Sequence, residues 1–332
     1  MMKLFTESPD KSEYARKEYL DGILNLVKKG FSDLPFKNTT TPIEDGFGAP
    51  LDREIAPSDF ISQEFVGEDE ICEIYRLRFL PLQNTPFFAL LFVPHKMATP
   101  SPLVVAANGL LGTPELMYGM HGTNGYSNLT ARLLKKGVCV LSPQFLLWNC
   151  GMSPAKPCYK TKYNRAEIDS RLKEKGGSIN SLEIFFLLSA LSALSKIKFL
   201  DTSKIAVCGM SYGAFLTMRT MAVSPLIKAG YFMSCANGSL EPDFPEWFFR
   251  APYTSLSDCE FLAYCAPRPV FVEVGKFDDI FPVDGAISEM SKAKKYYAQK
   301  GAEENFRFNI WNGGHIVNRE DTGIDYIISS LK

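Results

Sequence analysis

The stretch "KIAVCGMSYGAFL", residues 204–216, decides the fold of this chain. It begins with an apolar run typical of a buried strand and continues through Gly209 and Gly213, which bracket Ser211. Residues that favour a helix follow directly. A strand that turns sharply into a helix at a G-x-S-x-G pattern exposes its serine at the edge of an α/β sheet. Such a pattern also arises by chance, so the interpretation depends on the rest of the chain.

Strand-like and helix-like segments alternate on both sides of this stretch. The apolar runs predict strands over 72–80, 86–94, 103–108, 138–143, 204–209, 227–233, 269–275 and 306–311. Helices are predicted over 127–136, 181–195, from Ala214 onward, over 283–299, and at the C-terminal end near Leu331. Nearly continuous apolar strands that alternate with helices favour a parallel sheet covered on both faces. We therefore expect an α/β fold with a doubly wound, mostly parallel sheet, whose first two strands form an antiparallel pair.

The remaining segments suggest how the chain is organised. Residues 1–70 contain one amphipathic helical segment, over 14–29, and then a stretch punctuated by proline and glycine. We expect an N-terminal helical and extended accessory segment there, followed by one catalytic domain over 71–332. The insertion "NGSLEPDFPEWFFRAPYTSLSD" predicts a lid around residues 237–262.

Composition excludes several classes of function. The 332 residues are 46% apolar, and 36 Lys and Arg against 37 Asp and Glu give a formal charge of −1. Without a basic excess the chain is not expected to bind nucleic acid or an anionic membrane, and a small-molecule substrate fits better. Charges throughout the first thirty residues are unlike a secretory signal, which favours a cytoplasmic location. The most hydrophobic stretch, 184–194, is too short to span a bilayer.

The cysteines do not indicate a metal site. The chain has 8 of them, and no C-x-x-C pattern occurs among them. A zinc site needs clustered thiolates or imidazoles, and disulfide frameworks belong to short secreted chains. We expect reduced structural thiols, no metal and no cofactor.

A nucleophilic serine needs a base to take its proton and an acid to hold that base. The chain has three histidines, at positions 95, 121 and 315. His95 follows an early strand, ahead of the loops at the catalytic edge, which favours a surface or capping role. His315 lies in "NGGH" after the last predicted strand, where it can return toward Ser211, so we expect it to be the base.

The acid should follow another strand between the serine and the histidine. The segment "VEVGKFDDIFP" offers both Asp278 and Asp279 directly after the strand over 269–275. Position alone leaves the two aspartates open. The order serine, aspartate, histidine is nevertheless that of the α/β-hydrolase arrangement.

Three motifs carry a resemblance to a known family. "GMSYG" at the serine, "APRPVFVEVGKFDDIFP" at the acid and "NGGH" at the base make the chain from about residue 71 resemble the α/β-hydrolase superfamily. The similarity is to its dienelactone-hydrolase-like and acetyl-xylan-esterase-like members. In these families the acid lies in a G-x-x-D-x-x-x-P pattern, which here matches Gly275, Asp278 and Pro282. The resemblance thus implies Asp278 as the acid.

The resemblance also implies an oxyanion hole after the strand over 103–108. Relatives often carry His-Gly there, whereas this chain reads "VVAANGLLGTPE" and has Asn108 in place of the histidine. Because backbone amides do the work of such a hole, we expect the N–H groups of Leu110 and Tyr212 to form it.

Aromatic residues on neighbouring loops are candidates for substrate binding. They are Tyr118, His121 and Tyr126 after the oxyanion loop, Phe145 and Trp148 after the next strand, and Trp247 in the insertion. The alternative is that these side chains pack in the core or in the lid.

The leading function is hydrolysis of carboxylic esters, with small acyl esters such as acetyl esters as substrates. One alternative is a serine peptidase of the prolyl-oligopeptidase type, because those enzymes share the fold and a similar acid loop. The roughly seventy residues before the sheet are fewer than a β-propeller needs, which favours esters. The other alternative is a catalytically silent binding protein on the same scaffold. The sequence leaves the oligomeric state open.

Overall fold

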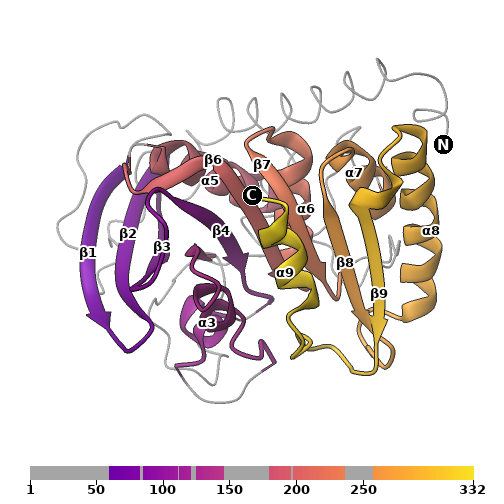
Figure 1. The fold of residues 1–332 in the computed structure, drawn as a ribbon, viewed down its shortest axis with the longest axis horizontal. Helices are drawn as coiled ribbons and strands as arrows, with labels where there is room; N and C mark the ends of the chain where they lie inside the picture. Colours follow the sequence, from indigo (N-terminus) through magenta and orange to yellow (C-terminus); the bar gives the residue numbers. More distant parts are fainter. Residues whose placement is uncertain are drawn as a thin grey trace.

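A nine-stranded sheet runs through the molecule (Figure 1). The computed structural model describes residues 60–82, 85–110, 112–120, 125–145, 179–195, 197–235 and 257–332. The spatial order of the strands is β1-β2-β3-β5-β4-β6-β7-β8-β9. Their bounds are β1 Phe60–Glu68, β2 Cys72–Leu82, β3 Thr85–Pro94, β4 Ser101–Ala107, β5 Cys139–Gln144, β6 Leu200–Met210, β7 Ile227–Met233, β8 Val270–Gly275 and β9 Phe306–Trp311.

The sheet is antiparallel at one side and parallel across the rest. β1, β2, β3 and β5 pair antiparallel in that order. From β5 through β4, β6, β7 and β8 to β9 every pairing is parallel. The expected α/β class with a mostly parallel sheet is confirmed, as is the antiparallel pair formed by β2 and β3.

Burial explains which strands the sequence revealed. Every residue of β5 and of β8 is buried, so both segments are mostly apolar. β1 lies at the edge of the sheet and most of its described side chains are exposed, so its segment "FISQEFVGE" shows no such run. The sequence did not predict β1. The sheet therefore begins ahead of residue 71, within the segment expected to be accessory.

Helices cover both faces of the sheet. Buried residues of α5 (Ile179–Leu194), α6 (Tyr212–Val223), α7 (Asp258–Cys265) and α8 (Val283–Gln299) join one apolar cluster. Those of α2 (Pro114–Tyr118), α3 (Leu129–Leu134) and α9 (Thr322–Ser329) join a second cluster on the other face. A short 3-10 helix, η6 (Glu303–Asn305), precedes β9. The doubly wound arrangement is thus confirmed.

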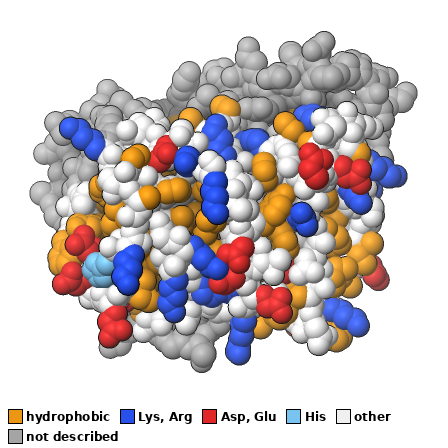
Figure 2. All heavy atoms as spheres, in the orientation of Figure 1, with side chains coloured by type: hydrophobic (Ala, Val, Ile, Leu, Met, Phe, Trp, Pro, Cys, Tyr) orange, Lys and Arg blue, Asp and Glu red, His pale blue; other side chains and the backbone are white. Residues whose placement is uncertain are grey.

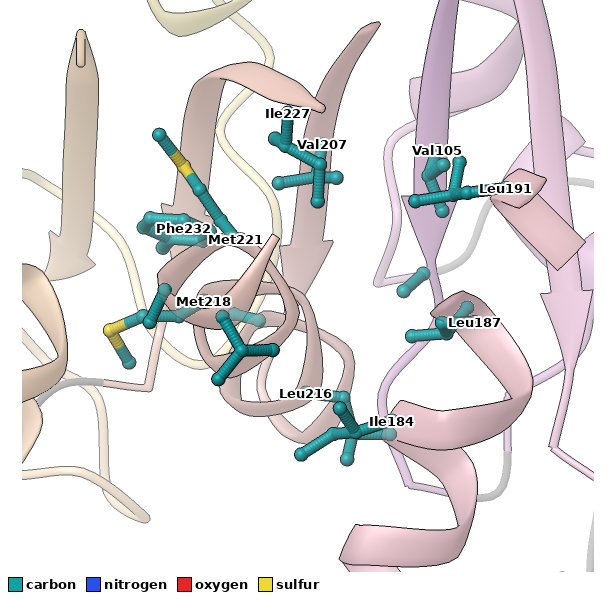
Figure 3. Packing of buried hydrophobic residues seen from close by; sticks show 14 of the residues in the cluster. Val105, Ile184, Leu187, Leu191, Val207, Leu216, Met218, Met221, Ile227 and Phe232 are labelled. Carbon is teal, nitrogen blue, oxygen red and sulfur yellow. The ribbon is translucent and has the colours of Figure 1, made fainter. Parts of the chain in front are cut away.

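The first cluster fixes the junction between β6 and α6 at the centre of the molecule. Figure 3 shows Val207 of β6 and Ile227 of β7 on the sheet side, with Leu216 of α6 and Ile184 of α5 below them. Burying each such aliphatic side chain contributes about 1.5–3 kcal/mol. The helix that follows the turn at Ser211 is buried along its whole length.

The sequence did not predict α7. This helix starts at Asp258, inside the stretch assigned to a lid, and a capping box of Ser257 and Glu260 marks its start. That S-x-x-E pattern was the available sequence signal. The rest of the lid expectation, residues 237–256, lies outside the described residues, as does the helix expected over 14–29.

The six cysteines in the described part of the chain are buried and free, in agreement with the expectation of structural thiols. No helix among the described residues is long and apolar enough to cross a membrane. On the face seen in Figure 2, basic and acidic side chains are intermixed, without a region of one sign.

Candidate active site

Ser211 stands at the turn between β6 and α6. Its φ of 56° and ψ of −121° are values that residues other than glycine rarely adopt. Its backbone N–H donates to the carbonyl of Met233 at the end of β7, with 2.8 Å between nitrogen and oxygen. Such a strained conformation persists only where the surroundings enforce it, and it is common at functional sites.

Two glycines make this turn possible. A Cβ atom at Gly209 would lie 2.4 Å from the carbonyl carbon of Gly213. A Cβ atom at Gly213 would lie 2.2 Å from the carbonyl oxygen of Ala107. Because both obstacles are backbone atoms, any side chain at either position would force the strand, the helix and the loop after β4 apart.

The loop after β4 approaches the serine closely. A Cβ atom at Gly109 would be 3.3 Å from the Cβ of Ser211. The Gly112 N–H donates to the carbonyl oxygen of Gly109 at 3.0 Å and so closes a turn in this loop. Leu110, at this turn, borders the cavity above Ser211. Tyr212 is the first residue of α6, where helix N–H groups have no partner within the helix. The two backbone segments expected to form an oxyanion hole therefore flank the serine.

Asp278 and His315 are joined directly. His315 Nδ1 lies 3.0 Å from Oδ1 and 2.9 Å from Oδ2 of Asp278. The carboxylate also accepts the backbone N–H groups of Ile280 at 3.0 Å and Phe281 at 2.8 Å. Burial by itself raises the pKa of Asp278, but the hydrogen bonds from His315, Phe281 and Ile280 outweigh it, so the pKa lies below its usual value. Its neighbour Asp279 is exposed.

Close backbone contact brings the acid loop to the histidine loop. A Cβ atom at Gly275, the last residue of β8, would lie 2.4 Å from the carbonyl oxygen of Gly314 and 2.5 Å from that of Gly313. The Phe277 N–H donates to Gly313 at 2.8 Å. The absence of a side chain at Gly275 thus allows Asp278 to reach His315.

A cavity of about 330 Å³ lies above the serine, at the carboxyl ends of the parallel strands. Its lining residues are Gly109, Leu110, Gly125, Tyr126, Met210, Ser211, Ile280, Phe281 and His315. Ser211 and His315 therefore face one space, although no hydrogen bond joins their side chains in the described part of the chain. Such contacts commonly tighten only when substrate binds.

The aromatic candidates are placed differently. Tyr118 stacks on Phe92 with 5.1 Å between ring centroids, and its hydroxyl donates to Asp69. It does not border the cavity. Phe145 is fully buried and packs edge-on against Tyr212 at 5.8 Å, as the core interpretation predicts. His121, Trp148 and Trp247 lie outside the described residues.

His95 is exposed, and its Nε2 lies 2.7 Å from the carbonyl oxygen of Asp69. Its expected surface role is confirmed, because it takes no part in the cavity.

Tyr126, one of the aromatic candidates, borders the cavity with its hydroxyl beside the loop after β4, and burial raises the pKa of that hydroxyl. A Cβ atom at Gly112 would lie 2.1 Å from this hydroxyl oxygen. Met210, Ile280 and Phe281 are apolar neighbours of functional residues in the sequence. Apolar residues in such positions look like ordinary core, so only the structure identifies them.

Solved structures of other proteins share this architecture. A glucuronoyl esterase from Solibacter usitatus has 14% sequence identity and a TM-score of 0.62, with 84% of this chain and 88% of that chain covered. A protein from Bacteroides fragilis NCTC 9343, assigned as an acetyl xylan esterase, has 17% identity and a TM-score of 0.61, with 92% and 76% covered. The chain has the α/β-hydrolase fold.

A curated protein shows sequence similarity to part of the chain. Acylamino-acid-releasing enzyme 1 from Oryza sativa subsp. japonica is 30% identical over 131 residues, which cover 37% of this chain and 16% of that enzyme. The match thus spans less than a fifth of the length of the rice enzyme. No protein-family model matches the chain.

Proposed function

We propose that this protein is a serine esterase that hydrolyses carboxylic esters through an acyl-enzyme on Ser211. The observation that carries the proposal is the placement of Ser211, in a strained strand-to-helix turn, beside a cavity shared with His315, which is hydrogen-bonded to Asp278. This order of residues on an α/β-hydrolase fold suits acyl transfer.

In the first half of the reaction, His315 Nε2 takes the proton of Ser211 Oγ as this oxygen attacks the ester carbonyl carbon. Asp278 accepts the Nδ1–H of His315 and stabilises the imidazolium that forms. The N–H groups of Leu110 and Tyr212 stabilise the oxyanion of the tetrahedral intermediate. The carbon–oxygen bond to the alcohol then breaks, and the alcohol leaves with the proton from His315.

In the second half, water enters and gives a proton to His315 as its oxygen attacks the acyl carbon. The second tetrahedral intermediate collapses, the bond to Ser211 Oγ breaks, and His315 returns the proton to the serine. The products are the free acid and the unchanged enzyme.

The cavity favours a small, neutral acyl group such as acetyl. Its volume of about 330 Å³ lies near the lower end of the range for ligand pockets. Leu110, Met210 and Phe281 supply apolar walls, and among the described lining residues only His315 can carry a charge. We propose Leu110 and Tyr126 as the side chains closest to the substrate.

Active-site labelling tests the proposal. A fluorophosphonate probe should label the wild-type protein at Ser211, and Ser211→Ala should abolish both this labelling and hydrolysis of p-nitrophenyl acetate. His315→Ala should lower kcat by about 10⁴-fold or more. Circular dichroism checks that both variants fold. A well-folded wild type without labelling or hydrolysis would favour the silent binding protein.

A second candidate is release of N-acylated amino acids or peptides. The observation that favours it is the 30% identity over 131 residues with acylamino-acid-releasing enzyme 1. The chemistry at Ser211 would be the same, with an amine as the leaving group. The two candidate functions are distinguished by comparing the hydrolysis rates of N-acetyl-alanine p-nitroanilide and p-nitrophenyl acetate. Faster turnover of the anilide, relative to the uncatalysed rates, would replace the ester proposal.

A further inference from the structure

A buried carboxylate that the proposed reaction does not use lies near the site. Glu273, on β8, is only 2% exposed. Its Oε2 accepts the hydroxyl of Tyr231 at 2.5 Å, and its Oε1 accepts the side-chain amides of Asn309 at 2.7 Å and Asn318 at 3.1 Å. Burying a carboxylate costs free energy unless hydrogen bonds satisfy it, and these three donors do so. Such an arrangement calls for a reason beyond simple packing.

The three donors to Glu273 lie on different segments of the chain. Tyr231 belongs to β7 and Asn309 to β9, where Asn309 is the register partner of Glu273. Both are therefore already held by the sheet. Asn318 instead lies on the loop between β9 and α9, three residues after His315. Its hydrogen bond ties the histidine loop to the sheet.

Further contacts hold the same loop. Arg132, on α3, donates to the carbonyl oxygens of Asn318 at 2.7 Å and Glu320 at 2.5 Å, and to the carboxylate of Asp321 at 2.8 Å. The Val317 N–H donates to Gly125, a cavity residue, at 2.8 Å. Asn318 thus accepts from a cation through its backbone carbonyl and donates to a buried carboxylate through its side chain.

We propose that Glu273 is a positioning residue, which acts through Asn318 to hold His315 in place between Asp278 and Ser211. The inference rests on the proposed function. A displacement of a catalytic group by about 1 Å can cost on the order of 10²-fold in rate, so a loop that carries the base needs a fixed attachment. The Asp278 bond orients the imidazole ring, whereas the Glu273 bond fixes the backbone that bears it.

Asn309 provides a matched control, because it donates to the same oxygen atom of Glu273 from outside the loop. Asn318→Asp and Asn309→Asp are isosteric, and each puts a second carboxylate against Glu273. The Asn318 change also preserves the acceptor that bonds the Glu320 N–H at 3.2 Å. We expect both variants to lose thermal stability, whereas kcat should fall about tenfold or more only in Asn318→Asp, with KM within about twofold.

Exchanging the carboxylate of Glu273 and the amide of Asn318 should restore activity. The double variant Glu273→Gln/Asn318→Asp places the amide on the strand and the carboxylate on the loop, so the same pair can bond with its polarity reversed. We expect kcat of the double variant to exceed that of Asn318→Asp alone by severalfold. No recovery, combined with equal kcat losses in the two single variants, would overturn the proposal.

A readout independent of turnover separates this inference from the proposed function. The downfield proton resonance of the His315 Nδ1–H, identified by its loss in His315→Ala, reports the Asp278 bond directly. It should shift or broaden in Asn318→Asp and stay unchanged in Asn309→Asp. If the wild type neither labels nor hydrolyses esters, the proposed function fails, while this spectrum still tests Glu273. An unchanged resonance in Asn318→Asp would refute the positioning role.

If Asn318→Asp does not fold, Asn318→Ala and Asn309→Ala carry the same comparison, because both remove a donor without adding charge. The outcomes are then judged as before, from kcat and from the His315 resonance. Equal kcat losses and equal spectra in this pair would also overturn the proposal.

Discussion

At the scale of single residues, two adjacent aspartates have opposite surroundings. Asp278 is 7% exposed and bonds His315, whereas Asp279 faces solvent. We predict that Asp278→Asn lowers kcat by about 10⁴-fold, because the amide no longer stabilises the imidazolium or its productive tautomer. Asp279→Asn is the control and should stay close to the wild type in p-nitrophenyl acetate assays. A larger loss in Asp279→Asn would show that the acid is assigned to the wrong residue.

The lowered pKa of Asp278 also predicts how stability depends on pH. A carboxyl whose pKa is lower in the folded than in the unfolded chain adds stability above its unfolded value, and this stability is lost as pH falls through the folded pKa. The unfolded reference is 3.8. Thermal unfolding should therefore show Asp278→Asn to be less stable than the wild type at pH 7, with a smaller difference near pH 3. A difference that grew on acidification would contradict the direction of the shift.

The lowered pKa of Asp278 also bears on how kcat/KM depends on pH. Asp278 stays ionised throughout the neutral and mildly acidic range, since its pKa lies below 3.8. Any loss of kcat/KM in the mildly acidic range is therefore not caused by protonation of Asp278.

At the scale of elements, Gly275 decides whether two loops can meet. A methyl group there would lie 2.4 Å from the Gly314 carbonyl oxygen, and a backbone atom cannot move aside without shifting the loop. We predict that Gly275→Ala lowers both kcat, by at least about tenfold, and the melting temperature. Gly67→Ala is the control, because no atom lies within 4 Å of the added carbon. Wild-type kinetics in Gly275→Ala would show that the loop contact is dispensable.

The helices and strands differ in how well the sequence predicted them. The inner parallel strands were predictable because burial on both faces demands an apolar residue at almost every position, as in β8. β1 was not, because an edge strand has one neighbour and tolerates the polar residues of its segment. α7 begins at a capping box, but its first residues fall within the stretch whose aromatic residues favoured a lid.

At the scale of the whole molecule, the two apolar clusters leave a small cavity between the loops at one edge of the sheet. Apart from Ser211, Tyr126 and His315 its described walls are apolar, so a charged acyl group would lose hydration there without gaining a fixed cation as its partner. We predict that p-nitrophenyl butyrate is hydrolysed with a kcat/KM at least about tenfold above that of the mono-p-nitrophenyl ester of succinate. Both acyl groups have four carbons, so the length of the carbon chain is matched. Equal or faster hydrolysis of the succinate ester would indicate a cation at the site.

The sequence by itself determined the fold class and the order of Ser211, Asp278 and His315, because apolar runs and a glycine-flanked serine leave local signals in the chain. It selected Asp278 over Asp279 only through a family pattern. The tertiary structure decided that Tyr118 and Phe145 pack away from the cavity while Tyr126 borders it. It also revealed Glu273 and Asn318, which lie 45 positions apart in the chain. Contacts of this kind depend on which strands lie side by side, and no local pattern records that neighbourhood.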